Sequence, residues 1–208
     1  MGEWTLVGKP ALLIVHMQNS VIKTPSPLEP MGHGKAAHEQ GVIGSIERLV
    51  AAFRGKELPV VYCATYTAPD VKWPVYGGFW QGSRQIKVNQ MGTWDVEVIE
   101  ELKPAPGERV FYNWPFNVLE GTGLHEYLKE DGVETVVLTG VATGMSVGTA
   151  AWALAERFYN LIVPADATTD ANSEVHSLVI GQILPAIGLI TTADDVIAHL
   201  QTRGSATI

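Results

Sequence analysis

Short apolar runs alternate with amphipathic segments along most of this chain. The first run, residues 11–15 (ALLIV), is typical of a strand buried on both faces of a parallel sheet. In the next segment, residues 39–56, apolar positions recur at the spacing of one helical face, and Gly55 can end the helix. The members of that face are Val42, Ile46, Leu49, Val50 and Phe53. The pattern therefore predicts a strand followed by a helix.

The same alternation continues to the end of the chain. Further strands are predicted at residues 59–66, 108–113, 134–141, 160–166 and 188–192, and further helices at 122–130, 145–158, 173–184 and 193–201. Strands joined by helices through short connections pair in parallel through right-handed crossovers. We therefore expect an α/β fold: a three-layer α/β/α sandwich around a mostly parallel, six-stranded, doubly wound sheet.

The chain has the length of one domain, and we interpret residues 1–208 as a single domain of a size typical of enzymes. One irregular stretch, at about residues 67–93, interrupts the alternation and is rich in aromatic side chains. Irregular segments of this length in a compact domain are usually lids, binding loops or subunit contacts. The sequence favours neither a lid nor an interface over the other.

Composition and charge exclude several classes of protein. The chain carries 14 Lys and Arg against 22 Asp and Glu, a net charge of -8, and this acidic balance argues against nucleic-acid binding. Its single cysteine, Cys63, cannot form an internal disulfide, and we expect it to be an inert strand residue. We also expect a cytoplasmic protein, because the first residues do not resemble a leader. The uncharged run 135–155 contains three glycines and reads as strand, loop and helix, so we expect no membrane span.

Ligands of open parallel sheets bind where the strands end at their carboxyl edge. His16 follows the first strand, Asn113 ends the strand at 108–113, and a loop at 142–146 follows the strand at 134–141. These positions are the first candidates for a functional site.

Four segments around these positions carry a family resemblance. They are 11–21 (ALLIVHMQNSV), 111–124 (FYNWPFNVLEGTGL), 136–155 (VVLTGVATGMSVGTAAWALA) and 163–176 (VPADATTDANSEVH). Over about residues 9–200 the chain resembles the isochorismatase-like (cysteine hydrolase) family. The resemblance implies a hydrolase of a small molecule, no cofactor, and a homo-oligomer, either a dimer or a tetramer. It implies no metal, because the Asp-x-His pair and further His of the nicotinamidase branch are not found.

Carried over position by position, the family's catalytic Asp, Lys and Cys fall on His16, Asn113 and Ser146. A serine hydroxyl needs a base, and His16 can supply one, with Asn113 bonding the imidazole or the substrate. The family's oxyanion hole, often with a cis peptide, falls on Val141 and Ala142 and leaves the N–H groups of Ala142 and Ser146 as donors. We expect hydrolysis of an ester, amide or enol-ether bond of a small cyclic molecule.

The same alignment suggests an apolar, aromatic substrate pocket. Its expected lining is Gln18, Tyr66, Phe79, Trp80, Tyr112 and Trp114. The four matched segments contain no Arg, so a dianionic substrate is not favoured. The nearest cations, Arg84 and Lys87, lie in the irregular stretch.

Several alternatives compete with this interpretation. Loss of all three family residues is also what a catalytically inactive pseudoenzyme would show, one that binds a small molecule or supports an assembly. A Ser146 to His16 distance within about 3.5 Å would favour catalysis. Residues 144–148 match G-x-S-x-G, but the strand does not end directly at the first glycine.

The remaining polar candidates are interpreted as structural. A Ser–Asp–His triad that uses Asp166 or Asp170 with His199 disagrees with the family alignment. His33, His38, His125 and His199 lie in polar segments, where we expect solvated side chains.

Overall fold

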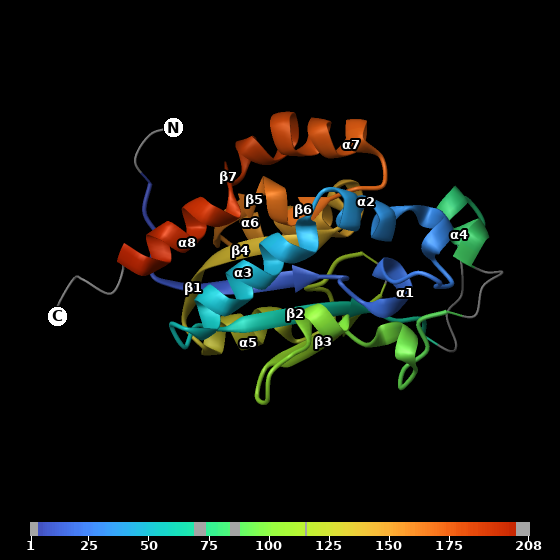
Figure 1. The fold of residues 1–208 in the computed structure, drawn as a ribbon, viewed down its shortest axis with the longest axis horizontal. Coiled ribbons are helices and arrows are strands. Elements are labelled where there is room, and N and C mark those ends of the chain that lie inside the picture. The colour runs from blue at the N-terminus through green and yellow to red at the C-terminus, as the bar shows by residue number, and fades with distance from the viewer. Residues whose placement is uncertain (1–3, 69–73, 84–87, 115, 203–208) are drawn as a thin grey trace.

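The computed structural model describes residues 4–68, 74–83, 88–114 and 116–202, and its centre is a seven-stranded sheet (Figure 1). The strands are β1 (Lys9–Val15), β2 (Val60–Thr65), β3 (Arg109–Asn113), β4 (Val133–Val141), β5 (Asn160–Pro164), β6 (Thr168–Thr169) and β7 (Leu189–Thr191). Their order is β3-β2-β1-β4-β5-β7, with β6 beside β4, and every described pair is parallel. The predicted α/β class and doubly wound sheet are confirmed.

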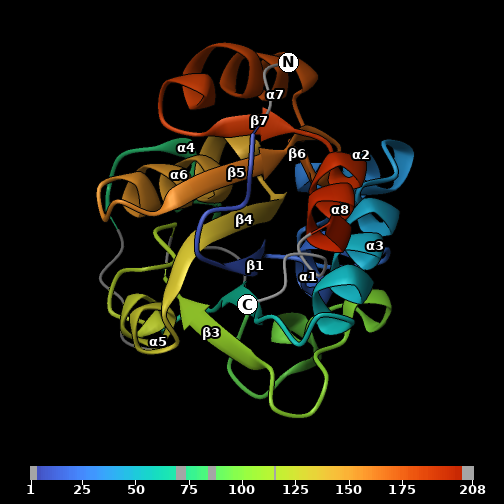
Figure 2. The ribbon, with the colours of Figure 1, turned by 90° about the vertical axis from the view of Figure 1, so that its left-hand side faces the viewer.

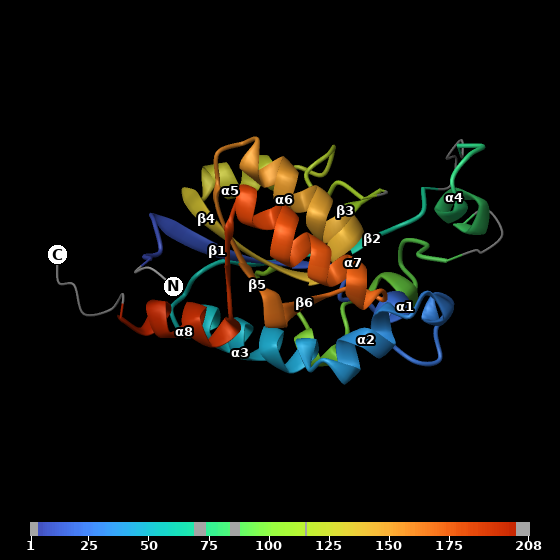
Figure 3. The same ribbon diagram turned by 90° about the horizontal axis from the view of Figure 1, so that it is seen from above.

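Helices cover both faces of the sheet. The α-helices are α1 (Asn19–Ile22), α2 (His33–Glu39), α3 (Val42–Arg54), α4 (Gly78–Ser83), α5 (Leu124–Glu130), α6 (Gly148–Ala155), α7 (Ser173–Leu178) and α8 (Ala193–Thr202). Helices α5, α6 and α7 lie over one face, and α2, α3 and α8 lie over the other (Figure 3). Seen end on, the strands fan from β3 at one edge to β7 at the other (Figure 2). The three predicted layers are therefore present.

Shorter helical turns complete the chain. They are η1 (Glu29–Met31), η2 (Trp94–Val96), η3 (Glu100–Leu102), η5 (Ala165–Ala167) and η7 (Leu184–Ala186), together with the π-helical turns η4 (Thr143–Val147) and η6 (Val179–Ile183). None of the helices in the described ranges is long and apolar enough to cross a membrane.

The sheet has one strand more than the six predicted. The expected strand at 160–166 ends at Pro164, because residues 165–167 form the turn η5. The chain then rejoins β4 as β6, where Thr168 and Thr169 pair with Gly140 and Val141. The short helices α1 and α2 were also absent from the prediction, because they carry too few turns for an apolar period to emerge.

Strand β1 divides its side chains between two cores, one on each face of the sheet. Leu12 and Ile14 pack with the helices α3 and α8, whereas Ala11, Leu13 and Val15 pack with α5 and α6. This division follows from the period of two in a strand, and both sets are fully buried. The predicted two-sided burial of the first strand is confirmed.

The chain reverses its direction of winding between β1 and β4, which lie side by side in the sheet. Beyond this point β2 and β3 extend to one edge, and β5 and β7 extend to the other. A crevice forms at the carboxyl ends of strands where the winding reverses, and ligands bind there. The fold thus places the ends of β1 and β4 at the centre of any functional site.

Gly140 makes the close approach of these two strands possible. It has φ of 110°, a conformation that side-chain-bearing residues rarely adopt, and a Cβ there would overlap the backbone of Val15. Neither β1 nor β4 can shift to make room, because each is hydrogen-bonded to a neighbour on its other side.

Gly140→Ala should therefore lower the free energy of unfolding by at least about 2 kcal/mol, from backbone strain and steric overlap. Chemical denaturation of the variant beside the wild type measures this loss. Gly44→Ala is the matched control, because Gly44 lies in helix α3 with no atom within 4 Å of the added Cβ. The free energy of unfolding of the control should rise by about 0.5–1 kcal/mol, because alanine favours a helix over glycine. Equal stability of the two variants would contradict the packing argument.

Candidate active site

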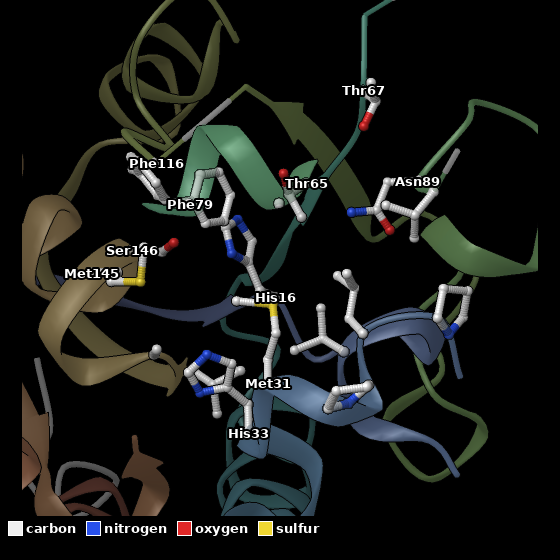
Figure 4. Close-up of a pocket in the computed structure, with 18 of the residues that line it drawn as sticks. His16, Met31, His33, Thr65, Thr67, Phe79, Asn89, Phe116, Met145 and Ser146 are labelled. Atoms are coloured by element: carbon white, nitrogen blue, oxygen red, sulfur yellow. The ribbon is translucent and has the colours of Figure 1, made fainter. Parts of the chain in front are cut away.

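A cavity of about 270 Å³ opens at the carboxyl ends of β1, β2 and β4. Its walls come from the segment between β1 and α2, the end of β2, helix α4, the residues after β3 and the loop after β4. His16, His33 and Ser146 are polar groups in a lining that is otherwise mostly apolar (Figure 4). This volume lies near the lower end of the range for small-molecule sites, about 300–1,000 Å³.

His16 leaves strand β1 in a left-handed backbone conformation, with φ of 54°. Its backbone N–H donates to the carbonyl of Cys63 at 2.8 Å, which fixes the turn at the strand end. Non-glycine residues in this region are uncommon and cluster at functional sites. The turn brings the imidazole to the cavity wall with only 5 % of the residue exposed.

A buried hydrogen bond joins His16 to Asn113. The Nε2 atom of His16 lies 3.0 Å from the Oδ1 atom of Asn113. An amide oxygen can only accept, so His16 donates through Nε2–H and, when neutral, keeps its lone pair on Nδ1. The structure therefore brings together the first two predicted catalytic residues and fixes the tautomer of the histidine.

Burial keeps His16 neutral. Its pKa is lowered to about 4, mainly by desolvation and to a smaller extent by the nearby His33, while the hydrogen bond with Asn113 acts in the opposite direction. At neutral pH the imidazole is therefore uncharged and has a free lone pair. Its basicity matches that of a carboxylate, whose ordinary pKa is about 4.

Asn113 is 1 % exposed, and its second polar atom is unsatisfied. Among the residues that the structure describes, Asn113 Nδ2 has no hydrogen-bond partner. An unsatisfied buried donor costs about 1–3 kcal/mol. The amide therefore binds the imidazole through one end only.

Ser146 lies in the π-helical turn η4 and is 4 % exposed. Its hydroxyl points toward the ring of His16 (Figure 4). No hydrogen bond between these two side chains is found in the described part of the structure. Ser146 and His16 thus share a cavity without forming a bonded dyad.

The loop that carries Ser146 is held from outside the cavity. The carboxylate of Asp170 accepts the Gly144 N–H at 2.8 Å, and Thr143 Oγ1 is hydrogen-bonded to His176 Nδ1 at 2.9 Å. The Val141–Ala142 peptide is cis, and the Ala142 carbonyl accepts the N–H groups of Met145 and Val147. Val141, Ala142 and Ser146 all line the cavity, as the oxyanion-hole alignment requires.

Phe79 and Trp114, two members of the expected aromatic lining, lie in the cavity wall. Trp80 belongs to helix α4, but its side chain lies outside the described part of the structure, as do Arg84 and Lys87. The Phe79 ring packs against Phe116 with centroids 4.8 Å apart. Part of the irregular stretch at 67–93 therefore forms one wall.

Gln18, Tyr66 and Tyr112 differ from the expectation, because they are not among the described lining residues. Gln18 is fully buried beneath the cavity, where its amide exchanges two hydrogen bonds with the backbone of Thr65. Tyr66 stands between two lining residues, Thr65 and Thr67, and alternate side chains of an extended chain face opposite ways, which accounts for its absence from the lining. Gln18 thus anchors the end of β2 instead of facing a ligand.

The structure corrects one expectation about the histidines. His33 is 8 % exposed and lines the cavity, although its polar sequence neighbourhood predicted a solvated side chain. Met31, Phe116 and Met145 also line the cavity without having been predicted. One signal in the sequence is the irregular, proline-rich segment 24–31, which lies between the strand that His16 follows and the helix that His33 begins.

The competing arrangements are not assembled. His199 stacks on Trp4 with ring centroids 3.7 Å apart, and Asp166 accepts the Ala193 N–H, so neither reaches the described wall of the cavity. Burial raises the pKa of the Cys63 thiol, which keeps it protonated inside β2. Within the described ranges, no group of three or more His, Cys, Asp and Glu side chains is arranged to hold a metal.

Comparison with known proteins shows the family. Residues 10–195 match the isochorismatase domain, so the chain belongs to the isochorismatase family. It is 31% identical over 173 residues to a ureidoacrylate amidohydrolase of Methylorubrum extorquens, a match that covers 77% of this chain and 69% of that protein. Proteins of this family are hydrolases.

Solved structures show the same fold. An isochorismatase family protein of Burkholderia thailandensis superposes with a TM-score of 0.75 at 27% identity, covering 95% of this chain and 98% of that one. The N-carbamoylsarcosine amidase of Thermoplasma acidophilum gives a TM-score of 0.69 at 25% identity, covering 89% and 97%.

The low pKa of His16 predicts how stability depends on pH. The unfolded chain binds a proton at this residue below about pH 6.5 and the folded protein only below about pH 4. Between these values the unfolded state holds more protons, so stability falls as the pH falls. The wild type should lose about 3 kcal/mol more between pH 7 and pH 4 than His16→Gln. Denaturant titrations at both pH values measure this, and equal losses would contradict it.

The bond between His16 and Asn113 predicts the effect of a charge at residue 113. Asn113→Asp should raise the pKa of His16 well above about 4, because a carboxylate that accepts Nε2–H stabilises the imidazolium. NMR titration of the His16 ring measures the change. Asn113→Leu, which removes the acceptor, should leave the pKa no higher than in the wild type. An unchanged value in Asn113→Asp would mean that the bond does not control the ring.

Proposed function

We propose that this protein hydrolyses an amide, ester or enol-ether bond of a small, uncharged cyclic molecule, with His16 as base and, for an amide or ester, Ser146 as nucleophile. The proposal rests on the arrangement around His16. This neutral side chain lines the cavity and is held in one tautomer by Asn113, and the Ser146 hydroxyl points toward its ring. The sequence resemblance supports the proposal, because it implies that His16, Asn113 and Ser146 replace the family's catalytic Asp, Lys and Cys.

For an amide or ester, the proposed steps need no group from outside the cavity except substrate and water. His16 takes the hydroxyl proton of Ser146 as Oγ attacks the carbonyl carbon. The resulting oxyanion is stabilised by the N–H groups of Ala142 and Ser146. The imidazolium then protonates the leaving amine or alcohol, and a water molecule deprotonated by His16 releases the acid from the acyl-enzyme. An enol ether would instead be hydrolysed by water, with His16 as acid and base.

The names of the relatives favour an amide among the three bonds. A ureidoacrylate amidohydrolase and an N-carbamoylsarcosine amidase are both, by name, hydrolases of C–N bonds. The cavity lining adds the preference for an uncharged molecule. No Lys, Arg, Asp or Glu side chain is among its described residues, and an ion would lose its hydration there without a counter-charge.

The proposal requires Ser146 and His16 to approach when substrate binds. Catalytic hydrogen bonds are often long or misaligned without substrate and tighten in the complex. A change in the side-chain rotamer of Ser146 moves the hydroxyl without disturbing η4, whose backbone is held by Asp170.

A second candidate is a pseudoenzyme that binds a small molecule without cleaving it. Two observations favour it: the missing hydrogen bond between Ser146 and His16, and the unsatisfied amide nitrogen of Asn113. The cavity remains open in either case.

Turnover of activated substrates separates the two candidates. With a panel of p-nitrophenyl esters, nitroanilides and aryl vinyl ethers, the wild type should show saturable hydrolysis, and p-nitrophenyl acetate should acetylate Ser146. Ser146→Ala should abolish the adduct and His16→Gln should slow its formation by about 100-fold or more, because general base catalysis contributes about that much. Intact-mass spectrometry and absorbance record both effects.

Matched controls are available on the surface. Ser177→Ala and His38→Gln change exposed residues of α7 and α2 that do not line the cavity, and both should keep wild-type rates. A folded wild type with neither turnover nor adduct across the panel would leave the binding-only candidate.

A further inference from the structure

His33 is a buried polar side chain to which the mechanism assigns no role. It is the first residue of helix α2, is 8 % exposed and lines the cavity with His16 and Ser146. Its ring lies beside the same space as His16, on the side away from Phe79 and Phe116 (Figure 4). The side chain thus faces the interior of the site from a second direction.

One hydrogen bond decides which atom His33 offers to the cavity. The backbone N–H of Ala171 donates to His33 Nδ1 at 3.2 Å, so Nδ1 must carry a lone pair. The neutral ring therefore has its proton on Nε2. No partner for Nε2 exists among the described residues, and this atom is not among the buried unsatisfied ones, so the cavity reaches it.

The position of His33 is fixed by the segment that also holds the Ser146 loop. Asp170 accepts the N–H groups of Gly144 and Asn172, and the next residue, Ala171, donates to His33. The ring cannot turn its Nε2–H toward solvent without losing the bond to Ala171. A donor held in this way is preorganised for an acceptor in the cavity.

We propose that His33 is a positioning residue whose Nε2–H donates a hydrogen bond to an uncharged acceptor, such as a carbonyl oxygen, on a ring-bearing ligand. The surroundings select this class of ligand. Leu28, Met31 and Met145 give the cavity an apolar lining, and Phe79 and Phe116 provide a surface for a ring. The inference rests on the proposed function for the location of the site but not for its chemistry.

Benzamide and toluene are the probes, because they share a ring and differ in the carbonyl group. Titration of each into the full chain at pH 7.5, followed by NMR, gives the two dissociation constants. His33→Leu should weaken benzamide binding by about 3- to 10-fold, the worth of one neutral hydrogen bond, and should leave toluene binding unchanged or tighter. His33→Gln keeps an N–H donor and should recover part of the benzamide affinity.

The control is His38→Leu, a change of an exposed histidine in the same helix. It should leave both affinities at wild-type values. In the wild type, the ¹⁵N resonance of His33 Nε2 should shift on adding benzamide and not on adding toluene, a change that a purely structural role would not produce.

Four results would overturn the inference. Two concern His33→Leu: an equal loss of affinity for benzamide and toluene, or an unchanged affinity for benzamide. Two concern the folded wild type: no binding of benzamide, or tighter binding of benzoate than of benzamide. Turnover that survives with unchanged KM in His33→Leu would reject the role of His33 and leave the proposed hydrolase intact. Selective loss of benzamide binding in a protein without turnover would support His33 and reject the hydrolase.

Discussion

Strands β1 and β4 meet so closely at Val15 and Gly140 that no side chain fits between them, and the site depends on this contact. Immediately beyond this contact the two strands diverge. One turns through the left-handed conformation of His16, and the other passes through Val141 and Ala142 into the loop of Ser146. Because both candidate groups leave the sheet within a few residues of the same contact, the backbone brings them to one cavity.

Burial then determines the chemistry that this backbone allows. His16 and Asn113 are almost fully enclosed, and a charged imidazolium there would lose hydration that no nearby anion replaces. A lysine at residue 113 would oppose protonation of the histidine further, whereas an amide bonds it without adding charge. The three residues at positions 16, 113 and 146 are therefore mutually compatible as a set of uncharged side chains.

The repeating elements could be predicted because each of them buries one face, and burial imposes a period on the sequence. The division of β1 between two cores and the single apolar face of α3 both follow from this rule. The wall of the cavity follows no such rule. His33 stands after a proline-rich segment without periodicity, and its burial depends on Ala171, a contact between residues distant in sequence. Gln18 keeps its place in the motif, yet the structure uses it to join two segments of backbone.

Motif positions also do not determine whether Ser146 and His16 act together. Their alignment with the family fixes which strands they follow, but a hydrogen bond depends on a rotamer and on shifts of a few tenths of an ångström. Segment 170–172 restricts such shifts, because it is hydrogen-bonded to Gly144 of η4 and, through Ala171, to His33. The loop of Ser146 and the ring of His33, which both line the cavity, are therefore supported by neighbouring residues of one short segment. This support depends on contacts between residues distant in sequence, so no local pattern in the sequence could predict it.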